Sequence, residues 1–215
     1  MADNSQICDF NFNLNPIDIS EIPRILKEKA NNLGLNTKEI ERKWIINADI
    51  LRYLMKDDKF LLSDYRIITQ GYLSIEPEIR IRRDFYPNIN ITKYFLSYKS
   101  SGTLSRDEYE VEINKDDYMY LYGILDARKN MESKLIYKEY YNYKMEELRG
   151  IEFEISNVDN NELTYLEIEF KSEEAANNFK IPDALNEFII KEVTNDASYK
   201  MKNYWKTTRI GIPTL

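Results

Sequence analysis

The chain has 215 residues, 43% of them apolar and 31% charged, with a single cysteine and no histidine. This length suits one domain with a sizeable core, and the lack of histidine excludes Ser-His-Asp and Cys-His catalysis, histidine-ligated zinc and imidazole acid–base chemistry. The net charge of −7 argues against broad nucleic-acid binding and against attachment to an anionic membrane.

The N-terminal segment, MADNSQICDF, has no basic region followed by an apolar core, so no secretory signal is visible. The longest apolar run, residues 118–125, is far too short to span a bilayer. The lone Cys8 excludes an internal disulfide framework and fits a reducing compartment. The sequence therefore predicts a cytoplasmic protein without a membrane partner.

Residues 1–36 are predicted to form an extension with one helix, ahead of a domain over residues 37–215. Ser20 is the candidate N-cap of this helix and Gly34 its candidate end. The helix has an apolar stripe made of Ile22, Ile25, Leu26 and Leu33. The stripe favours packing on the main domain, with contact to a partner or a second copy as the alternative.

From residue 37 onward the dominant pattern is the period-two alternation of β-strands. It predicts strands over residues 39–46, 78–85, 92–100, 106–113, 133–141, 150–157 and 164–172. Asn47, Asn114 and Ser172 are candidate N-caps for helices over 48–55, over 115–128 and from 173 onward, and a last helix is expected over about 196–205. We therefore predict one α+β domain dominated by an antiparallel sheet.

One face of the predicted strands is almost wholly ionisable. Its acidic positions are Glu39, Glu41, Glu108, Glu110, Glu112, Glu152, Glu154, Glu167 and Glu169. Its basic positions are Lys43, Arg80, Arg82, Lys99, Arg106 and Lys134. The opposite face is apolar, with residues such as Ile40, Trp44, Ile79, Ile81, Phe153, Leu166 and Ile168.

Two arrangements fit this pattern. The charged face lies in solvent, or the sheet curls into a barrel whose charged face points inward and whose apolar face is covered by helices. Buried ions are costly unless they are paired or bound to a ligand. An inward face with both signs of charge therefore predicts a charged guest, with the acids holding divalent cations and the bases a polyanion.

At this point the sequence resembles a known family. The segment EIERK at 39–43 resembles the ExExK motif of CYTH domains, the triphosphate tunnel metalloenzymes. The resemblance continues through QGYL at 70–73, IRIR at 79–82, Lys99, SRDEYE at 105–110, LEIEF at 166–170, EVTND at 192–196 and Tyr199. It spans residues 37–204 or so and is most similar to the small bacterial tripolyphosphatase-like members.

The resemblance implies an eight-stranded antiparallel β-barrel with short flanking helices that binds a triphosphate-containing small molecule together with Mg²⁺ or Mn²⁺. The activity that it favours is metal-dependent hydrolysis of inorganic tripolyphosphate or a nucleoside triphosphate. A class IV-type adenylyl cyclase and a non-catalytic triphosphate-binding module are the alternatives.

The resemblance also implies roles for single residues. The expected catalytic residues are Glu39, Glu41, Lys43 and Lys134. The expected substrate-binding residues are Arg80, Arg82, Lys99, Arg106, Glu108 and Glu110, with the two glutamates either orienting a water or holding the bases in place. The expected metal ligands are Glu39, Glu41, Glu154, Glu167 and Glu169. Where the family often has Lys-x-Arg-Tyr, this chain reads KLIY at 134–137, so Ile136 removes one expected phosphate contact.

Overall fold

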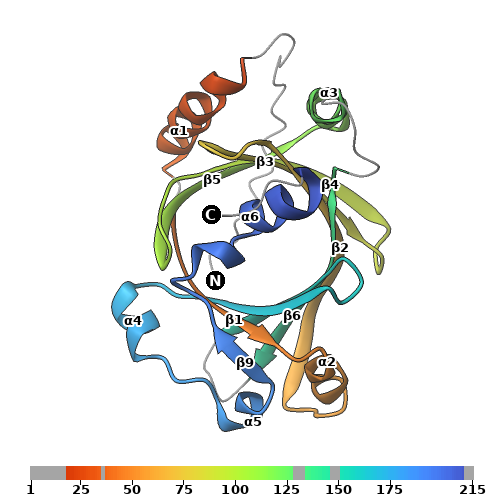
Figure 1. The fold of residues 1–215 in the computed structure, drawn as a ribbon, viewed down its shortest axis with the longest axis vertical. Coiled ribbons are helices and arrows are strands. Elements are labelled where there is room, and N and C mark those ends of the chain that lie inside the picture. The colour runs from red at the N-terminus through yellow and green to blue at the C-terminus, as the bar shows by residue number, and fades with distance from the viewer. Residues whose placement is uncertain (1–17, 35–36, 128–133, 146–150, 211–215) are drawn as a thin grey trace.

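The computed structural model describes residues 18–34, 37–127, 134–145 and 151–210. Its central feature is an antiparallel β-barrel, visible in Figure 1 as a ring. The strands of the barrel are β1 (Lys38–Ile46), β2 (Phe60–Ser74), β3 (Glu78–Tyr86), β4 (Ile91–Lys99), β5 (Ser105–Ile113), β6 (Ile136–Met145), β7 (Glu152–Val158) and β8 (Leu163–Glu169). They follow one another in the order β5-β4-β3-β2-β6-β7-β8-β1, and β1 pairs with β5 to close the ring. The predicted α+β fold with an eight-stranded antiparallel barrel is confirmed.

Two strands were not predicted from the sequence. The strand β2 breaks the alternation because its register shifts between Leu62 and Asp64, where it pairs with β6. The short strand β9 (Ile189–Glu192) pairs with β1 outside the ring. The first residues of two predicted strands, 133 and 150, lie outside the described residues.

The helices cover the outer face of the barrel in two groups (Figure 1). On one side α1 (Ile22–Leu33) and α3 (Lys115–Asp126) pack against β3, β4 and β5, and bury residues such as Leu26, Leu121 and Leu96. On the other side α2 (Asp49–Leu54) and α5 (Asp183–Asn186) pack against an apolar cluster that includes Trp44, Phe153 and Ile168. Since the apolar faces of the strands meet the helices, the ionisable faces point into the barrel.

The helix ends follow local side-chain chemistry. Asn114 caps α3 by accepting a hydrogen bond from the backbone N–H of Asp117, and Ser172 caps α4 (Glu173–Asn178) in the same way. Gly34 ends α1 in a left-handed conformation with φ 62°. The prediction of Ser20 as the N-cap is wrong, because Asp18 accepts the N–H of Ser20 and caps the short 3-10 helix over 19–21 instead.

The C-terminal segment crosses one end of the barrel. It contains a 3-10 turn (Ala197–Tyr199), α6 (Met201–Trp205) and a π-helical turn (Lys206–Ile210). In Figure 1, α6 lies over the opening of the ring. The Trp205 ring is 5.6 Å from the ring of Tyr72 and belongs to the same apolar cluster as Ile136, so this end of the barrel is filled by side chains.

No helix among the described residues is long and apolar enough to cross a membrane.

Candidate active site

The barrel encloses a cavity of about 840 Å³ whose walls are mostly charged. All of the predicted site residues except Lys134 line this cavity: Glu39, Glu41, Lys43, Arg80, Arg82, Lys99, Arg106, Glu108, Glu110, Glu154, Glu167 and Glu169. They come from β1, β3, β4, β5, β7 and β8, and meet because their strands present the same face inward. Glu112, from the same predicted face, lies outside the cavity lining and pairs with Lys93.

Two arginines on β3 are held by glutamates on β5. One Arg80 Nη atom lies 3.2 Å from Glu108 Oε1 and 3.0 Å from Glu110 Oε2, and Arg82 donates to Glu110 Oε1 at 2.7 Å. Although burial favours the protonated form of Glu110, Arg82 and Arg80 hold its pKa below the ordinary value. In this arrangement Glu108 and Glu110 orient the arginines, and the guanidiniums stay charged.

A second set of ion pairs joins β1, β4 and β5. Glu39 accepts from Lys99 at 2.8 Å and from Arg106 at 2.6 Å. Burial opposes the charge on Glu39, yet Lys99 and Arg106 hold its pKa well below the ordinary value. Its neighbour Glu41 shares Arg106 at 3.2 Å, but burial and the carboxylates of Glu167 and Glu39 raise the pKa of Glu41 to about 8.

Carboxylates face each other where β7, β8 and β1 run side by side. Glu154 lies directly opposite Glu167, and Glu169 lies directly opposite Glu41. Burial and Glu167 raise the pKa of Glu154 to about 7, and burial and Glu154 raise that of Glu169 to about 7. Like charges in opposing positions are destabilising, so this wall of the cavity favours a bound cation.

The donors on this wall fit a divalent ion. Mg²⁺ and Mn²⁺ prefer oxygen ligands, and the wall supplies carboxylates from three adjacent strands. Neither Glu154 nor Glu169 makes an ion pair within the described part of the chain. No group of three or more acidic or cysteine side chains is already arranged to hold an ion within the described ranges. Glu41 and Glu167 are instead drawn to Arg106 and Lys43, so a bound ion would replace these contacts.

Comparison with known proteins places this architecture in a family. Residues 37–198 match the model of the CYTH domain. The chain belongs to the CYTH domain family. It is 32% identical to the "Inorganic triphosphatase" of Nitrosomonas europaea over 138 residues, which cover 63% of this chain and 81% of that protein.

Two solved structures are also similar to this CYTH domain. The crystal structure of the inorganic triphosphatase NE1496 is 27% identical, with 82% of this chain and 97% of that chain covered and a TM-score of 0.49. A protein from Pyrococcus horikoshii is 23% identical, with 69% and 85% covered and a TM-score of 0.47.

The place of Lys134 in this CYTH domain differs from the prediction. Its ammonium donates to the carbonyls of Leu125 and Asp126 at the C-terminal end of α3, and it does not line the cavity. The residues that β6 points into the cavity are Lys138 and Tyr140. Ile136, where the family often has arginine, is fully buried in the apolar cluster around Trp205.

Three cations that line the cavity were not predicted from the sequence: Arg66, Lys138 and Lys200. Lys138 donates to the hydroxyl of Tyr165 at 2.6 Å, and burial lowers its pKa to about 7. Arg66 on β2 lies 4.2 Å from the ring of Tyr140 and donates to the buried Asp84 at 3.2 Å. The period-two alternation could have identified Lys138, because it places this residue on the inward face of β6. It could not identify Arg66, because Arg66 lies in a strand that was not predicted.

Proposed function

We propose that this protein hydrolyses a phosphoanhydride bond of inorganic tripolyphosphate with a divalent metal ion, inside the charged cavity. The observation that carries the proposal is a closed barrel whose lining combines fixed guanidinium groups on one wall with carboxylates that face each other on another. Membership of the CYTH family supports it. The inorganic triphosphatase at 32% identity favours tripolyphosphate over a nucleoside triphosphate.

The bases of the cavity would bind the polyanion. Arg80, Arg82, Lys99 and Arg106 all lie at hydrogen-bonding distance from glutamates and are thereby fixed before substrate arrives. Arginine donates in a fork that matches phosphate oxygens, and two arginines two positions apart on one strand can reach neighbouring phosphates. Preorganised cations of this kind also stabilise the charge that develops on a transferred phosphoryl group.

The carboxylate wall would hold the ion. Glu41, Glu154, Glu167 and Glu169 are the ligands that we assign to it. When bound, Mg²⁺ or Mn²⁺ would supply Lewis-acid stabilisation of the phosphate oxygens. The chain itself adds Lys138 to the bases of the cavity: burial lowers the pKa of its amine to about 7, and a bound polyanion would favour the charged form.

Product analysis tests this function. The full-length protein is incubated with Mg²⁺ or Mn²⁺ and with tripolyphosphate, pyrophosphate or ATP, and the products are resolved by ion-exchange chromatography. We expect orthophosphate and pyrophosphate from tripolyphosphate, in a metal-dependent reaction faster than that with ATP. Cyclic nucleotide with pyrophosphate from ATP would identify a cyclase, and binding without any product would identify a non-catalytic module.

A further inference from the structure

Tyr165 contacts two lysines of the cavity at once. It is buried on β8, with 1% of its surface exposed, and its side chain lines the cavity. Lys138, on β6, donates to the Tyr165 hydroxyl at 2.6 Å. Lys43, on β1, places its ammonium 3.5 Å from the centre of the Tyr165 ring. One aromatic side chain thus meets one lysine with its hydroxyl and the other with its face.

These contacts oppose a repulsion between the two amines. The charge of Lys43 disfavours the charged form of Lys138, which shows that the two groups are electrostatically close. Lys43 has a second anchor, Glu167 at 2.9 Å. Among the described residues, the hydrogen bond to Tyr165 is the contact that holds the Lys138 amine.

The position of Tyr165 is itself fixed. Its strand lies between β7 and β1, and its hydroxyl also hydrogen-bonds the side chain of Ser156 on β7. A tyrosine ring has two side-chain torsions, so packing against its neighbours leaves it little freedom. A cation over the face of a buried ring gains more than at an exposed site. The spacing of the two amines is therefore set by a rigid group between them.

We propose that Tyr165 is a positioning residue that holds Lys43 and Lys138 as a pair, so that both amines bind one phosphate group of the substrate. The inference rests on the proposed function in that the ligand is a triphosphate. A purely structural role for Tyr165 in the core would change stability without changing affinity for the ligand.

The two parts of the contact can be separated by substitution. Tyr165→Phe keeps the ring under Lys43 and removes the hydrogen bond to Lys138, whereas Tyr165→Leu removes both contacts. Tyr141→Phe is the matched control, since Tyr141 packs against the ring of Tyr65 and does not line the cavity. Lys138→Met removes the amine that the hydroxyl holds.

Calorimetric titration of the full-length variants with tripolyphosphate in EDTA measures binding without turnover. We expect Tyr165→Phe to raise Kd about tenfold, and Tyr165→Leu to raise it further, because hydrogen bonds to charged groups contribute strongly. Tyr141→Phe should leave Kd unchanged. In the Lys138→Met background, Tyr165→Phe should have no further effect, since the partner of the hydroxyl is gone.

Two results would overturn the inference: a Kd for Tyr165→Phe equal to that of Tyr141→Phe, or an undiminished effect in the Lys138→Met background. Melting temperatures of the same variants show whether stability alone has changed. Turnover of the wild-type protein, measured separately with Mg²⁺, tests the proposed function. A protein that binds but does not hydrolyse tripolyphosphate would contradict that function and leave the binding test of Tyr165 intact.

Discussion

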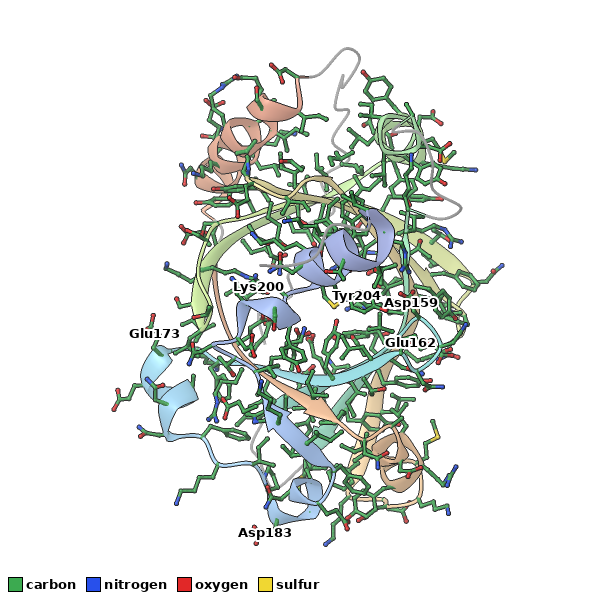
Figure 2. All side chains as sticks on the ribbon, in the orientation of Figure 1. Asp159, Glu162, Glu173, Asp183, Lys200 and Tyr204 are labelled. Carbon is green, nitrogen blue, oxygen red and sulfur yellow. The ribbon has the colours of Figure 1, made fainter. Side chains whose placement is uncertain are left out.

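Glu154 and Glu167 occupy directly opposing positions on the neighbouring strands β7 and β8, so that two half-buried carboxylates face each other across one wall of the cavity. The next strand repeats the arrangement, with Glu41 opposite Glu169. The side-chain view in Figure 2 shows that side chains fill much of the ring seen in Figure 1, and that Lys200 and Tyr204 of the C-terminal segment lie over it. A wall of facing carboxylates is unfavourable in the absence of a cation, so the stability of the protein should depend on divalent ions and on pH.

Divalent ions should stabilise the fold. An ion that binds the native state alone raises stability with its concentration, and here it would also relieve the repulsion between Glu154 and Glu167. We expect Mg²⁺ or Mn²⁺ to raise the melting temperature by several degrees at about 100 times Kd. Glu154→Gln should raise the melting temperature in EDTA and shrink the shift with metal. An equal shift in wild type and Glu154→Gln would exclude Glu154 as a ligand.

The stability of the metal-free protein should fall as the pH rises from about 4.5 towards 7. The pKa values of Glu154 and Glu169 are about 7, and that of Glu41 is about 8, all above the ordinary glutamate value of 4.5. Between pH 4.5 and about 7 these carboxyls bind more protons in the native state than in the unfolded state, so the free energy of unfolding decreases with pH in this window. Above about pH 7 the lowered pKa of Lys138 acts in the opposite direction.

Urea unfolding in EDTA at a series of pH values measures this slope. Glu154→Gln should flatten it, and saturating Mg²⁺ should reduce it. The ion pairs of Glu39 act in a different window, because its lowered pKa contributes stability that is lost only as the pH falls below about 4.5. A free energy of unfolding that rises steadily from pH 5 to 8 would contradict the assignment.

Arg82 should contribute to binding, unlike its neighbour Arg83. Arg82 lines the cavity, while Arg83 follows it on the opposite face of β3 and lies near the ring of Phe85. Since a charge-assisted hydrogen bond contributes about 1.5–3 kcal/mol, Arg82→Ala should raise the Kd for tripolyphosphate between tenfold and a hundredfold or so. The matched Arg83→Ala variant should bind as wild type does. Equal affinities in the two variants would remove Arg82 from the binding site.

Replacing Lys134 should affect stability but not binding, and replacing Lys138 should affect binding but not stability. Because Lys134 donates to the last carbonyls of α3, Lys134→Met should lower the free energy of unfolding by roughly 1–3 kcal/mol and leave tripolyphosphate affinity unchanged. Lys138→Met should weaken binding and, since the buried amine is replaced by an apolar side chain, preserve stability. Chemical denaturation and calorimetry of the two variants separate these effects. Weaker binding of tripolyphosphate by Lys134→Met would instead support the prediction from the sequence that Lys134 acts in the catalytic site.

The sequence predicts the barrel because period-two alternation identifies both the strands and their faces. Whether a residue occupies an odd or an even position in a strand gives its face, but this parity does not show how far along the strand the cavity extends. Lys134, just ahead of β6, has the same parity as Ile136 and Lys138 on that strand, but the cavity begins only at Lys138. The cavity ends there because Trp205 packs beside Ile136 and donates to the backbone carbonyl of Lys134, a contact between segments far apart in the sequence.

The ion pairs of the cavity could not be predicted from the sequence either. The pattern showed that acids and bases share one face, but the structure alone shows which glutamates neutralise arginines and which are left to face each other. Glu110 and Glu39 are of the first kind, whereas Glu154 lies opposite Glu167 and Glu169 lies opposite Glu41. The expected roles of these residues stay predictions until variants are measured.

The N-terminal extension is described in part. The helix α1 packs on β4 and β5, and Lys27 lies 5.1 Å from the ring of Tyr98, which favours the packing alternative for this segment. Contact with a partner or a second copy through residues 1–36 stays a prediction, since residues 1–17 lie outside the described residues. The division of the chain at residue 36 was not tested.

The most direct test of the account is the rate of orthophosphate release from tripolyphosphate with Mg²⁺ by wild type, Glu169→Gln and Glu112→Gln. Glu169 lines the carboxylate wall, while Glu112 pairs with Lys93 away from the cavity. We predict that Glu169→Gln lowers kcat/KM about a hundredfold or more, a loss of roughly 2.7 kcal/mol of transition-state stabilisation, and that Glu112→Gln matches wild type. Equal rates for all three proteins, or release that persists in EDTA, would contradict a metal-dependent hydrolase built on this wall.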